Sequence, residues 1–257
     1  MQTLDIVQQP WTAKFRALPL RTAWFSSMVM EHVPRDRPVR ILDVGCGTGD
    51  LTASLAHSLP QATLTGLDIS RANIETAARL TSDPTIAKRL EFVCADYLSF
   101  QPPEPFDLII SDGVLHLVHD PAEQLFAKLS TELARGGQLV FAIPYPCAFN
   151  FALVSVRRCL RAVRGPWTDR LIFAVARALH AHQMPDELLR ERVHYMYLVP
   201  QRVLSAKLVE RLEHGHDLQH VADRSCPHAS FGQPKHRVAV FRKPGECRLQ
   251  NAPRLAG

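Results

Sequence analysis

The residues of this chain best suited to chemistry are three acids, Asp43, Asp68 and Asp96, each near the end of a short apolar run. Parallel strands of an α/β sheet present their carboxyl ends at one edge, and ligands bind there. Three carboxylates at one edge could accept hydrogen bonds from an ammonium group, a pair of ribose hydroxyls and an amine. Taken one at a time, each acid also suits a turn or a helix N-cap.

Three glycines at alternate positions, Gly45, Gly47 and Gly49, follow Asp43 and precede a helical pattern. Glycine allows a positive φ and lets a ligand approach the main chain closely, and a helix N-terminus attracts a carboxylate or phosphate. The G-x-G-x-G spacing differs from the G-x-G-x-x-G of dinucleotide-binding loops, and Asp43 would repel a pyrophosphate. The spacing favours another nucleotide-like ligand, with a plain strand-to-helix turn as the alternative.

Residues 43–49, Asp-Val-Gly-Cys-Gly-Thr-Gly, resemble the first motif of class I methyltransferases that use S-adenosylmethionine. The resemblance implies that this loop cradles the methionine end of the cofactor, while Asp68 binds the ribose hydroxyls. It also implies that Ile69 packs on the adenine face and that Asp96 accepts a hydrogen bond from the adenine amine. The cofactor-binding residues expected on this basis are Asp43, Gly45, Cys46, Gly47, Gly49, Asp68, Ile69, Asp96, Tyr97 and Ser111.

Two later segments extend the resemblance to residues 37–145, with a weaker match over 200–243. Residues 106–116 resemble the fourth motif, with Asp112 where an Asn is frequent, and residues 133–144 resemble the fifth strand. An Asn-Pro-Pro-Tyr or Asp-Pro-Pro-Tyr segment, which marks amide and base N-methyltransferases, does not follow the fourth strand. The chain is therefore similar to the small-metabolite, type 11/12-like group of these enzymes.

The resemblance implies a Rossmann-like, doubly wound α/β fold with a seven-stranded sheet and an antiparallel last strand. Two late strands are expected at 217–222 and 236–241, and Gly-Gly at 136–137 is expected to form a left-handed turn after a helix. The expected division is an N-terminal helical segment (1–36), a cofactor-binding core (37–144), a helical lid (145–199), a C-terminal helix with the last strands (200–243) and a disordered tail (244–257).

Apolar residues recur at helical spacing through the expected lid, which predicts helices over 149–163 and 171–182 and a third that opens at Pro185. A second helical segment, residues 11–33, is expected to close the pocket from the other side. Five arginines lie within residues 157–170. Three interpretations of this run stay open: a solvated helix face, a clamp for an anionic substrate, or a helix that lies on a membrane surface.

The composition limits the class of protein. A chain of 257 residues with 46% apolar residues suits one domain with a sizeable core. It has no apolar run long enough to span a bilayer, and residues 1–10 lack a signal-peptide pattern. Its six cysteines include no C-x-x-C pair and suggest free thiols in a cytoplasmic protein. The histidines near Cys226 do not have the spacing of a standard metal site, so no metal is expected.

The candidate catalytic residues are His116, placed just after the fourth strand, Tyr145, which follows the fifth, and His194 in the expected lid. A hydroxyl acceptor would use a base, whereas a carboxylate or thiolate would not. His116 could equally be a packing or exposed histidine, and a tyrosine beside a pocket more often shapes it than transfers protons.

The sequence thus predicts an enzyme that transfers a methyl group from S-adenosylmethionine to a small molecule, with an oxygen acceptor, carboxylate or hydroxyl, as the first choice. One alternative is an RNA methyltransferase, suggested by the net charge of +5. A second is a dinucleotide-dependent oxidoreductase. A third is a protein that binds the cofactor without catalysis. No nucleic-acid partner is expected, and contact with a membrane surface stays open.

Overall fold

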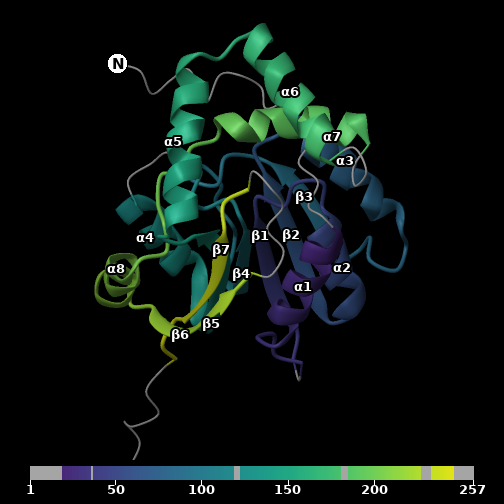
Figure 1. Cartoon of the computed structure of the whole chain (residues 1–257). Coiled ribbons are helices and arrows are strands. Elements are labelled where there is room, and N and C mark those ends of the chain that lie inside the picture. The colour runs from purple at the N-terminus through teal and green to yellow at the C-terminus, as the bar shows by residue number, and fades with distance from the viewer. Residues whose placement is uncertain (1–18, 36, 119–121, 181–184, 227–232, 246–257) are drawn as a thin grey trace, which may run out of the picture.

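A seven-stranded sheet organises the chain in the computed structural model, which describes residues 19–35, 37–118, 122–180, 185–226 and 233–245 (Figure 1). The strand order is β3-β2-β1-β4-β5-β7-β6. Strands β1 to β5 run parallel, and β7 is antiparallel to both β5 and β6. The strands are β1 (Val39–Val44), β2 (Ala62–Asp68), β3 (Leu90–Cys94), β4 (Phe106–Asp112), β5 (Leu133–Pro144), β6 (Gln219–Ser225) and β7 (His236–Arg242). The predicted Rossmann-like sheet with an antiparallel last strand is confirmed.

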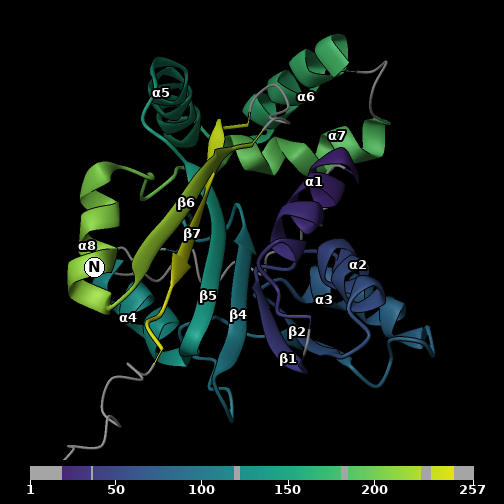
Figure 2. The ribbon, with the colours of Figure 1, turned by 90° about the horizontal axis from the view of Figure 1, so that it is seen from below.

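Helices cover both faces of this sheet, with α1, α2 and α3 on one face and α4 and α8 on the other (Figure 2). The segment 145–199, called the insert segment below, folds separately as α5, α6, α7 and a short 3-10 helix. The helices are α1 (Pro19–Met30), α2 (Asp50–Ser58), α3 (Arg71–Ala77), η1 (Ala78–Ser82), α4 (Ala122–Glu132), α5 (Ala148–Ala162), α6 (Pro166–His180), α7 (Asp186–Val193), η2 (His194–Tyr197) and α8 (Ala206–His216).

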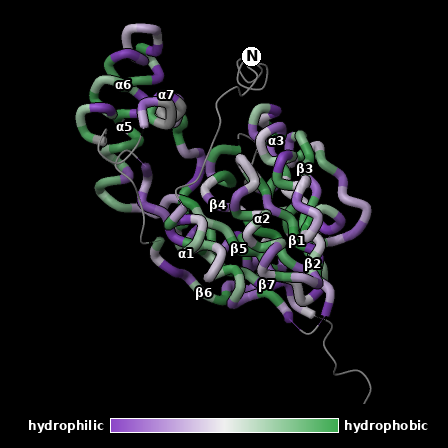
Figure 3. The backbone as a smooth tube through the Cα atoms, turned by 90° about the vertical axis from the view of Figure 1, so that its right-hand side faces the viewer, coloured by the Kyte–Doolittle hydropathy of each residue, from purple (hydrophilic) through white to green (hydrophobic). Residues whose placement is uncertain are grey.

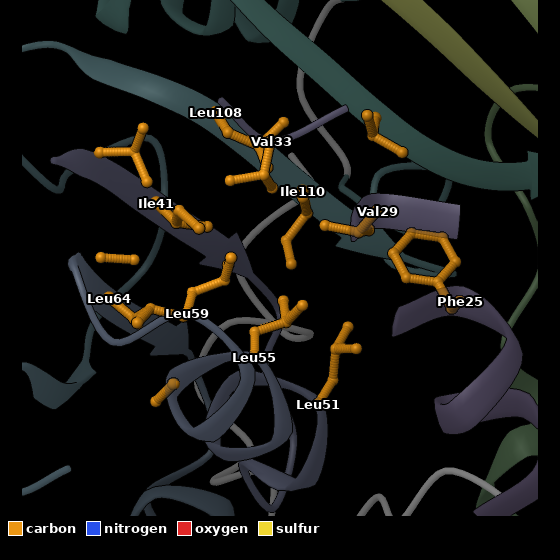
Figure 4. Packing of buried hydrophobic residues seen from close by; sticks show 14 of the residues in the cluster. Phe25, Val29, Val33, Ile41, Leu51, Leu55, Leu59, Leu64, Leu108 and Ile110 are labelled. Atoms are coloured by element: carbon orange, nitrogen blue, oxygen red, sulfur yellow. The ribbon is translucent and has the colours of Figure 1, made fainter. Parts of the chain in front are cut away.

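Two apolar clusters, one on each face, hold the helices to the sheet. Alternate residues of a strand point to opposite faces, so Ile41 joins the cluster beneath α1 and α2, whereas Leu42 joins the cluster beneath α4 and α8. In the first cluster Phe25 of α1 and Leu55 of α2 are fully buried and face the strands (Figure 4). Burial on both faces explains why the central strands are almost continuously apolar.

Some predicted boundaries move by a few residues. β3 ends at Cys94, so Asp96 and Tyr97 lie in the turn that follows it rather than in the strand. α6 begins at Pro166, five residues before the expected start, because proline suits the first position of a helix. Gly136 does have a positive φ of 75°, but it lies within β5, where its N–H donates to the Lys243 carbonyl. The expected left-handed residue therefore lies in the first part of β5 and does not form the C-cap of α4.

The insert segment joins the sheet through one buried amide. Asn150 of α5 donates from Nδ2 to the carbonyls of Tyr145 and Lys235, both at 2.8 Å, and its Oδ1 accepts from the Lys235 N–H at 2.8 Å. These three bonds fix the first turn of α5 to the end of β5 and to the residue before β7. The insert segment therefore begins at the edge of the sheet where the parallel strands end. The predicted tail falls mostly on residues 246–257, outside the described residues.

Candidate functional site

The glycine loop after β1 requires glycine for two separate reasons. Gly45, Gly47 and Gly49 have φ values of 79°, 57° and 81°, a region that other residues rarely adopt. A Cβ on Gly45 would lie 2.3 Å from Cγ2 of Val114, and a Cβ on Gly49 would lie 2.6 Å from Cζ of Phe92. The loop is thus a bare main-chain turn that leads directly into α2, as predicted.

Asp43 lies beneath this loop with 1% of its surface exposed. Its Oδ2 accepts a hydrogen bond from Thr52 Oγ1 of α2 at 2.7 Å. Burial, and to a smaller extent the charges of Asp112 and Asp68, raise the pKa of Asp43 to about 7, although the Thr52 hydrogen bond opposes this shift. A cation beside this carboxyl would favour its charged form, so the site is suited to an ammonium or sulfonium and unsuited to a phosphate.

Asp68 at the end of β2 fixes the loop to the next strand. Its Oδ2 accepts from the Gly47 N–H at 2.9 Å, and its Oδ1 accepts from the Ser70 N–H at 2.8 Å and from Asn73 Nδ2 at 3.2 Å. A carboxylate has about four acceptor positions, so one position remains for a ligand. Burial raises the pKa of Asp68, and these hydrogen bonds oppose that effect.

The neighbours of Asp68 differ in what they offer a ligand. Ile69 is a large apolar side chain with 43% of its surface exposed at the sheet edge, which suits a flat aromatic ring. Asp96 is half-buried and accepts from the Leu98 N–H at 3.2 Å. Tyr97 is buried in the core and donates its hydroxyl to Glu132 Oε2 at 2.7 Å. The side chain of Tyr97 therefore belongs to the core, and only its main chain is left for a ligand.

Two of the expected cofactor-binding residues, Ser111 and Cys46, also pack or hydrogen-bond within the protein itself. Ser111 is fully buried and donates from Oγ to the Val44 carbonyl at 2.8 Å, which ties the end of β4 to the end of β1. Cys46 is buried beneath the loop, where its Sγ would lie 3.1 Å from a Cβ on Gly66. Burial raises the pKa of this thiol well above its usual value, so Cys46 is uncharged and unreactive at neutral pH.

The end of β4 carries a buried ion pair that sequence reasoning missed. Arg21 of α1 donates from Nε to both carboxylate oxygens of Asp112, at 3.1 and 2.8 Å, and its Nη2 also contacts Oδ1. Both side chains are largely buried, and the pKa of Arg21 rises because the carboxylate favours its charged form despite burial. This pair holds α1 over the end of β4.

Two buried histidines lie beside this pair. The ring of His116 is 5.3 Å from that of His236, the first residue of β7. His116 Nδ1 makes no hydrogen bond among the described residues, and the His236 ring has only a poorly aligned contact with the main chain of Pro234. Burial lowers the pKa of His116 well below its usual value and lowers that of His236 to about 3. Both rings are therefore neutral at pH 7.

Three arginines lie close enough to His116 to affect its pKa, and two of them also affect that of His236. Arg157 of α5 is 2% exposed and donates to the Leu198 carbonyl at 2.7 Å, while Arg202 donates to the Leu115 carbonyl. The charges of Arg21, Arg157 and Arg202 all lower the pKa of His116, so the electrostatic potential at this ring is positive. We call these five residues, Arg21, His116, Arg157, Arg202 and His236, the basic cluster.

The basic cluster lies at the carboxyl edge of the sheet. His236 pairs with Pro144 at the end of β5, and Gly113 follows the last residue of β4. A Cβ on Gly113 would lie 3.7 Å from Nη2 of Arg21 and 3.8 Å from Nε2 of His236. Two nitrogen atoms from different elements thus converge on one point above the end of β4.

The three expected catalytic residues do not form one group. His116 belongs to the basic cluster. Tyr145 is half-buried at the end of β5, where its ring lies 4.9 Å from the guanidinium of Arg237. His194 is half-buried in η2 at the end of the insert segment. The next residue, Tyr195, raises the pKa of Arg21 through a Coulombic interaction, so η2 lies near the basic cluster.

A family profile described as "Methyltransferase domain" matches residues 41–137, from within β1 into β5. Over residues 41–137 the chain is therefore similar to methyltransferase domains. This region contains the glycine loop, the three predicted acids and His116, whereas the insert segment and His236 lie outside it. The predicted family resemblance is confirmed over the cofactor-binding part of the chain.

Curated relatives match about half of the chain or somewhat less. The chain is 38% identical over 142 residues to a trans-aconitate 2-methyltransferase of Streptomyces avermitilis, across 54% of this chain and 50% of that protein. It is 38% identical over 105 residues to a malonyl-[acyl-carrier protein] O-methyltransferase of Anoxybacillus flavithermus, across 41% and 39% of the two chains. The chain therefore spans about half the length of the trans-aconitate relatives that it matches.

Solved structures with this fold include the N-methyltransferase NodS of Bradyrhizobium japonicum in complex with S-adenosylhomocysteine. It superposes with a TM-score of 0.55 at 19% identity and covers 88% of both chains. The [4+2]-cyclase SpnF superposes with a TM-score of 0.56 at 16% identity, over 86% of this chain and 80% of its own. Because a methyltransferase and a cyclase share the fold, function must be argued from the site.

The described residues contain no group of three or more His, Cys, Asp or Glu side chains arranged to hold a metal ion. None of their helices combines the length and the apolar character needed to cross a membrane.

Proposed function

We propose that the protein transfers a methyl group from S-adenosylmethionine to a carboxylate oxygen of a small molecule. The match to a methyltransferase domain supports the cofactor, and the basic cluster supports the acceptor. The relatives named above include methyltransferases whose names specify trans-aconitate and malonyl-[acyl-carrier protein], both of which carry carboxylates.

The residues of the glycine loop fit this cofactor. The bare main chain at Gly45, Gly47 and Gly49 leaves room that a Cβ would fill, and the buried carboxyl of Asp43 favours a neighbouring cation. We assign the methionine end of the cofactor to this loop, the ribose hydroxyls to the open acceptor position of Asp68, and the adenine face to the exposed side chain of Ile69. Asp96 is assigned to the adenine amine.

The basic cluster is the observation that most strongly supports a carboxylate acceptor. Buried polar atoms nearly always have hydrogen-bond partners, yet His116 Nδ1 and both ring nitrogens of His236 have none of good geometry among the described side chains and main chain. The potential at these rings is positive. A carboxylate placed there would be attracted by the charges and would accept hydrogen bonds from the ring N–H groups and guanidinium groups.

Methyl transfer to a carboxylate requires no base, because the reacting oxygen is already ionised at neutral pH. S-adenosylmethionine, when bound, supplies a methyl group activated by its sulfonium. The acceptor oxygen bonds to the methyl carbon as the carbon–sulfur bond breaks, which leaves a methyl ester and S-adenosylhomocysteine, and no proton moves. The residues of the basic cluster hold the acceptor in line with the methyl group, and positioning of this kind accounts for a large part of such catalysis. His116 is thus proposed as a binding group, not as a base.

The test is a product analysis with methyl-labelled S-adenosylmethionine and a panel of di- and tricarboxylates that includes trans-aconitate. The expected product is a base-labile methyl ester, with no product from the corresponding amides. Labelled hydroxyl, nitrogen or carbon products in place of an ester would contradict the proposal.

A variant of His236 separates acceptor binding from cofactor binding. His236→Gln should raise KM for the carboxylate about tenfold or more, through loss of a buried hydrogen bond to a charged group. Its Kd for S-adenosylhomocysteine should stay near that of the parent protein. Arg242→Gln, at the other, exposed end of β7, is the matched control and should change neither value. An equal loss of both affinities in His236→Gln would assign the cluster to the cofactor's own carboxylate.

A further inference from the structure

The net charge of the molecule is concentrated in one pair of helices. Residues 148–180, which form α5 and α6, contain six arginines and one acid, a formal charge of +5. The whole chain also has a formal charge of +5, so the remaining residues, with 24 basic and 24 acidic side chains, balance to zero. The single acid, Asp169, accepts a hydrogen bond from the Tyr197 hydroxyl at 2.6 Å and faces inward.

The same two helices expose most of the large apolar side chains that are accessible on the described surface. Trp167, Leu171, Val175 and Leu179 are spaced four residues apart along α6, so they form one stripe. Trp167 is 72% exposed and the other three are each about half exposed. Thr168, which follows Trp167, is buried against the molecule. The stripe therefore faces outward and is not part of the core.

α5 continues this surface. Phe151 and Val156 of α5, and Val163 directly after it, are exposed, whereas Asn150 and Arg157 are buried. Figure 3 shows α5, α6 and α7 projecting together from the body of sheet and helices, with hydrophobic and hydrophilic stretches alternating along them. Arg158, Arg161 and Arg170 are exposed on these helices. We call the exposed apolar and basic side chains of α5 and α6 the outer face of the insert segment.

We propose that the outer face of the insert segment binds the surface of an anionic membrane. An amphipathic helix that has apolar side chains with a tryptophan on one side and arginines beside them is suited to lie in a lipid interface, with the arginines at the anionic headgroups. The side chains of α5 and α6 meet this description in composition and in placement, since a stripe that follows one helix axis can lie flat in a planar interface.

Other occupants fit the outer face less well. A second copy of the chain would bring two faces of charge +5 together, and like charges across an interface disfavour association. RNA would match the charge, but RNA-binding surfaces offer aromatic rings on which bases stack, whereas this stripe is mainly aliphatic. Binding to a membrane uses both the charge and the apolar stripe.

The test is sedimentation of the full chain with vesicles of phosphatidylcholine alone and of equal parts phosphatidylcholine and phosphatidylglycerol. The protein should bind the anionic vesicles, and binding should weaken as salt is added. Absence of binding, or equal binding to both kinds of vesicle, would overturn the proposal. So would tight RNA binding without vesicle binding, or a dimer that Trp167→Ser dissociates.

Three variants separate charge, apolar contact and general effects. R158Q/R161Q/R170Q should weaken vesicle binding about a hundredfold, because each charge near the surface contributes about fivefold. W167S/L171S should weaken it about tenfold or more through lost apolar burial. R79Q/K88Q/R135Q, which removes three exposed charges from the sheet body, is the control and should bind nearly as the parent does.

These variants lie outside the proposed methyl-transfer site, so their Kd for S-adenosylhomocysteine should equal that of the parent protein. This measurement also checks that each variant is folded. A control variant that loses as much binding as the arginine variant would show a non-specific charge effect and overturn the proposal. Unchanged vesicle binding in W167S/L171S would also overturn the proposal, because the apolar stripe would then not contribute to membrane binding.

Discussion

Two kinds of buried ionisable side chain define the site at the scale of the residue. Asp43 has a pKa raised to about 7, and His236 has a pKa lowered to about 3. Burial disfavours charge in both cases, so each group is kept near neutrality until a ligand of the opposite charge arrives. A cation at Asp43 and an anion at His236 would both relieve this cost, which agrees with a cationic cofactor and an anionic acceptor bound at the same edge of the sheet.

Asp43→Asn should stabilise the ligand-free protein above pH 7 and weaken cofactor binding. An unfolded Asp ionises near pH 4 and the folded one near pH 7, so the folded protein loses stability as pH rises through this window. An asparagine cannot ionise, so the variant does not lose stability in this way. We expect a gain of about 1–3 kcal/mol in the free energy of unfolding at pH 8 that shrinks toward pH 4, measured by urea denaturation. A gain that is independent of pH would mean that Asp43 is not the titrating group.

Gly49→Ala should destabilise the protein through two effects that a matched glycine separates. The positive φ of 81° costs about 1–2 kcal/mol for an L residue, and the new Cβ would also meet the ring of Phe92. Gly136 has a similar φ of 75°, but a Cβ there would meet nothing within 4 Å. Gly136→Ala therefore measures the backbone cost alone. Gly49→Ala should lose clearly more stability in thermal unfolding, and equal losses would show that Phe92 moves aside freely.

At the residue scale, the sequence supplied predictions for the whole cofactor side, whereas for the acceptor side it singled out His116 and an arginine run. The glycines and acids of the loop follow one another within a short segment, so their spacing carries information. The residues of the basic cluster come from α1, the end of β4, α5, the segment before α8, and β7. Arg157 was one of five arginines in a run, and its burial, which distinguishes it from Arg158 and Arg161, depends on the helix face that packs inward.

At the scale of the element, β7 is the strand whose position matters most for the acceptor. Because it runs antiparallel to β5, its first residue meets the carboxyl ends of the parallel strands. The expected antiparallel last strand contained this information, and it could have directed attention to His236. Arg21 could not be found in this way, since its place depends on how α1 crosses the sheet.

Asn150→Ala should loosen α5 from the sheet and impair acceptor binding more than cofactor binding. The substitution removes three hydrogen bonds and leaves the buried carbonyls of Tyr145 and Lys235 without this partner, so we expect a loss of about 2–4 kcal/mol in unfolding free energy. Arg157 of the basic cluster is carried by the same helix, and KM for the acceptor should therefore rise. Ser155→Ala, which removes one exposed hydrogen bond on α5, is the control. A larger effect on the Kd for S-adenosylhomocysteine than on KM would place the role of Asn150 elsewhere.

At the scale of the whole molecule, charge and function are divided between two parts. The rest of the chain is neutral in sum and includes the region that matches a methyltransferase domain, whereas α5 and α6 hold the excess charge. The members of the arginine run differ in burial: Arg157 belongs to the basic cluster, whereas Arg158 and Arg161 are exposed to solvent. The net charge of the chain is thus a property of one surface and gives no reason to expect RNA along the rest of the molecule.

Ligand binding should stabilise the molecule as a whole, and this distinguishes the proposed cofactor from a dinucleotide. The glycine loop is tied to β2 through Asp68 and to the core beneath α2 through Asp43 and Thr52, so a ligand held by the loop binds only the folded chain. At a concentration of one hundred times its Kd, S-adenosylhomocysteine should add about 2.7 kcal/mol to the free energy of unfolding. In a chain of this size that corresponds to a rise in Tm of about 5–10 °C. NAD at the same concentration should leave Tm unchanged, because its pyrophosphate would approach the carboxyl of Asp43. A rise with NAD and none with S-adenosylhomocysteine in differential scanning fluorimetry would show that the loop binds a dinucleotide.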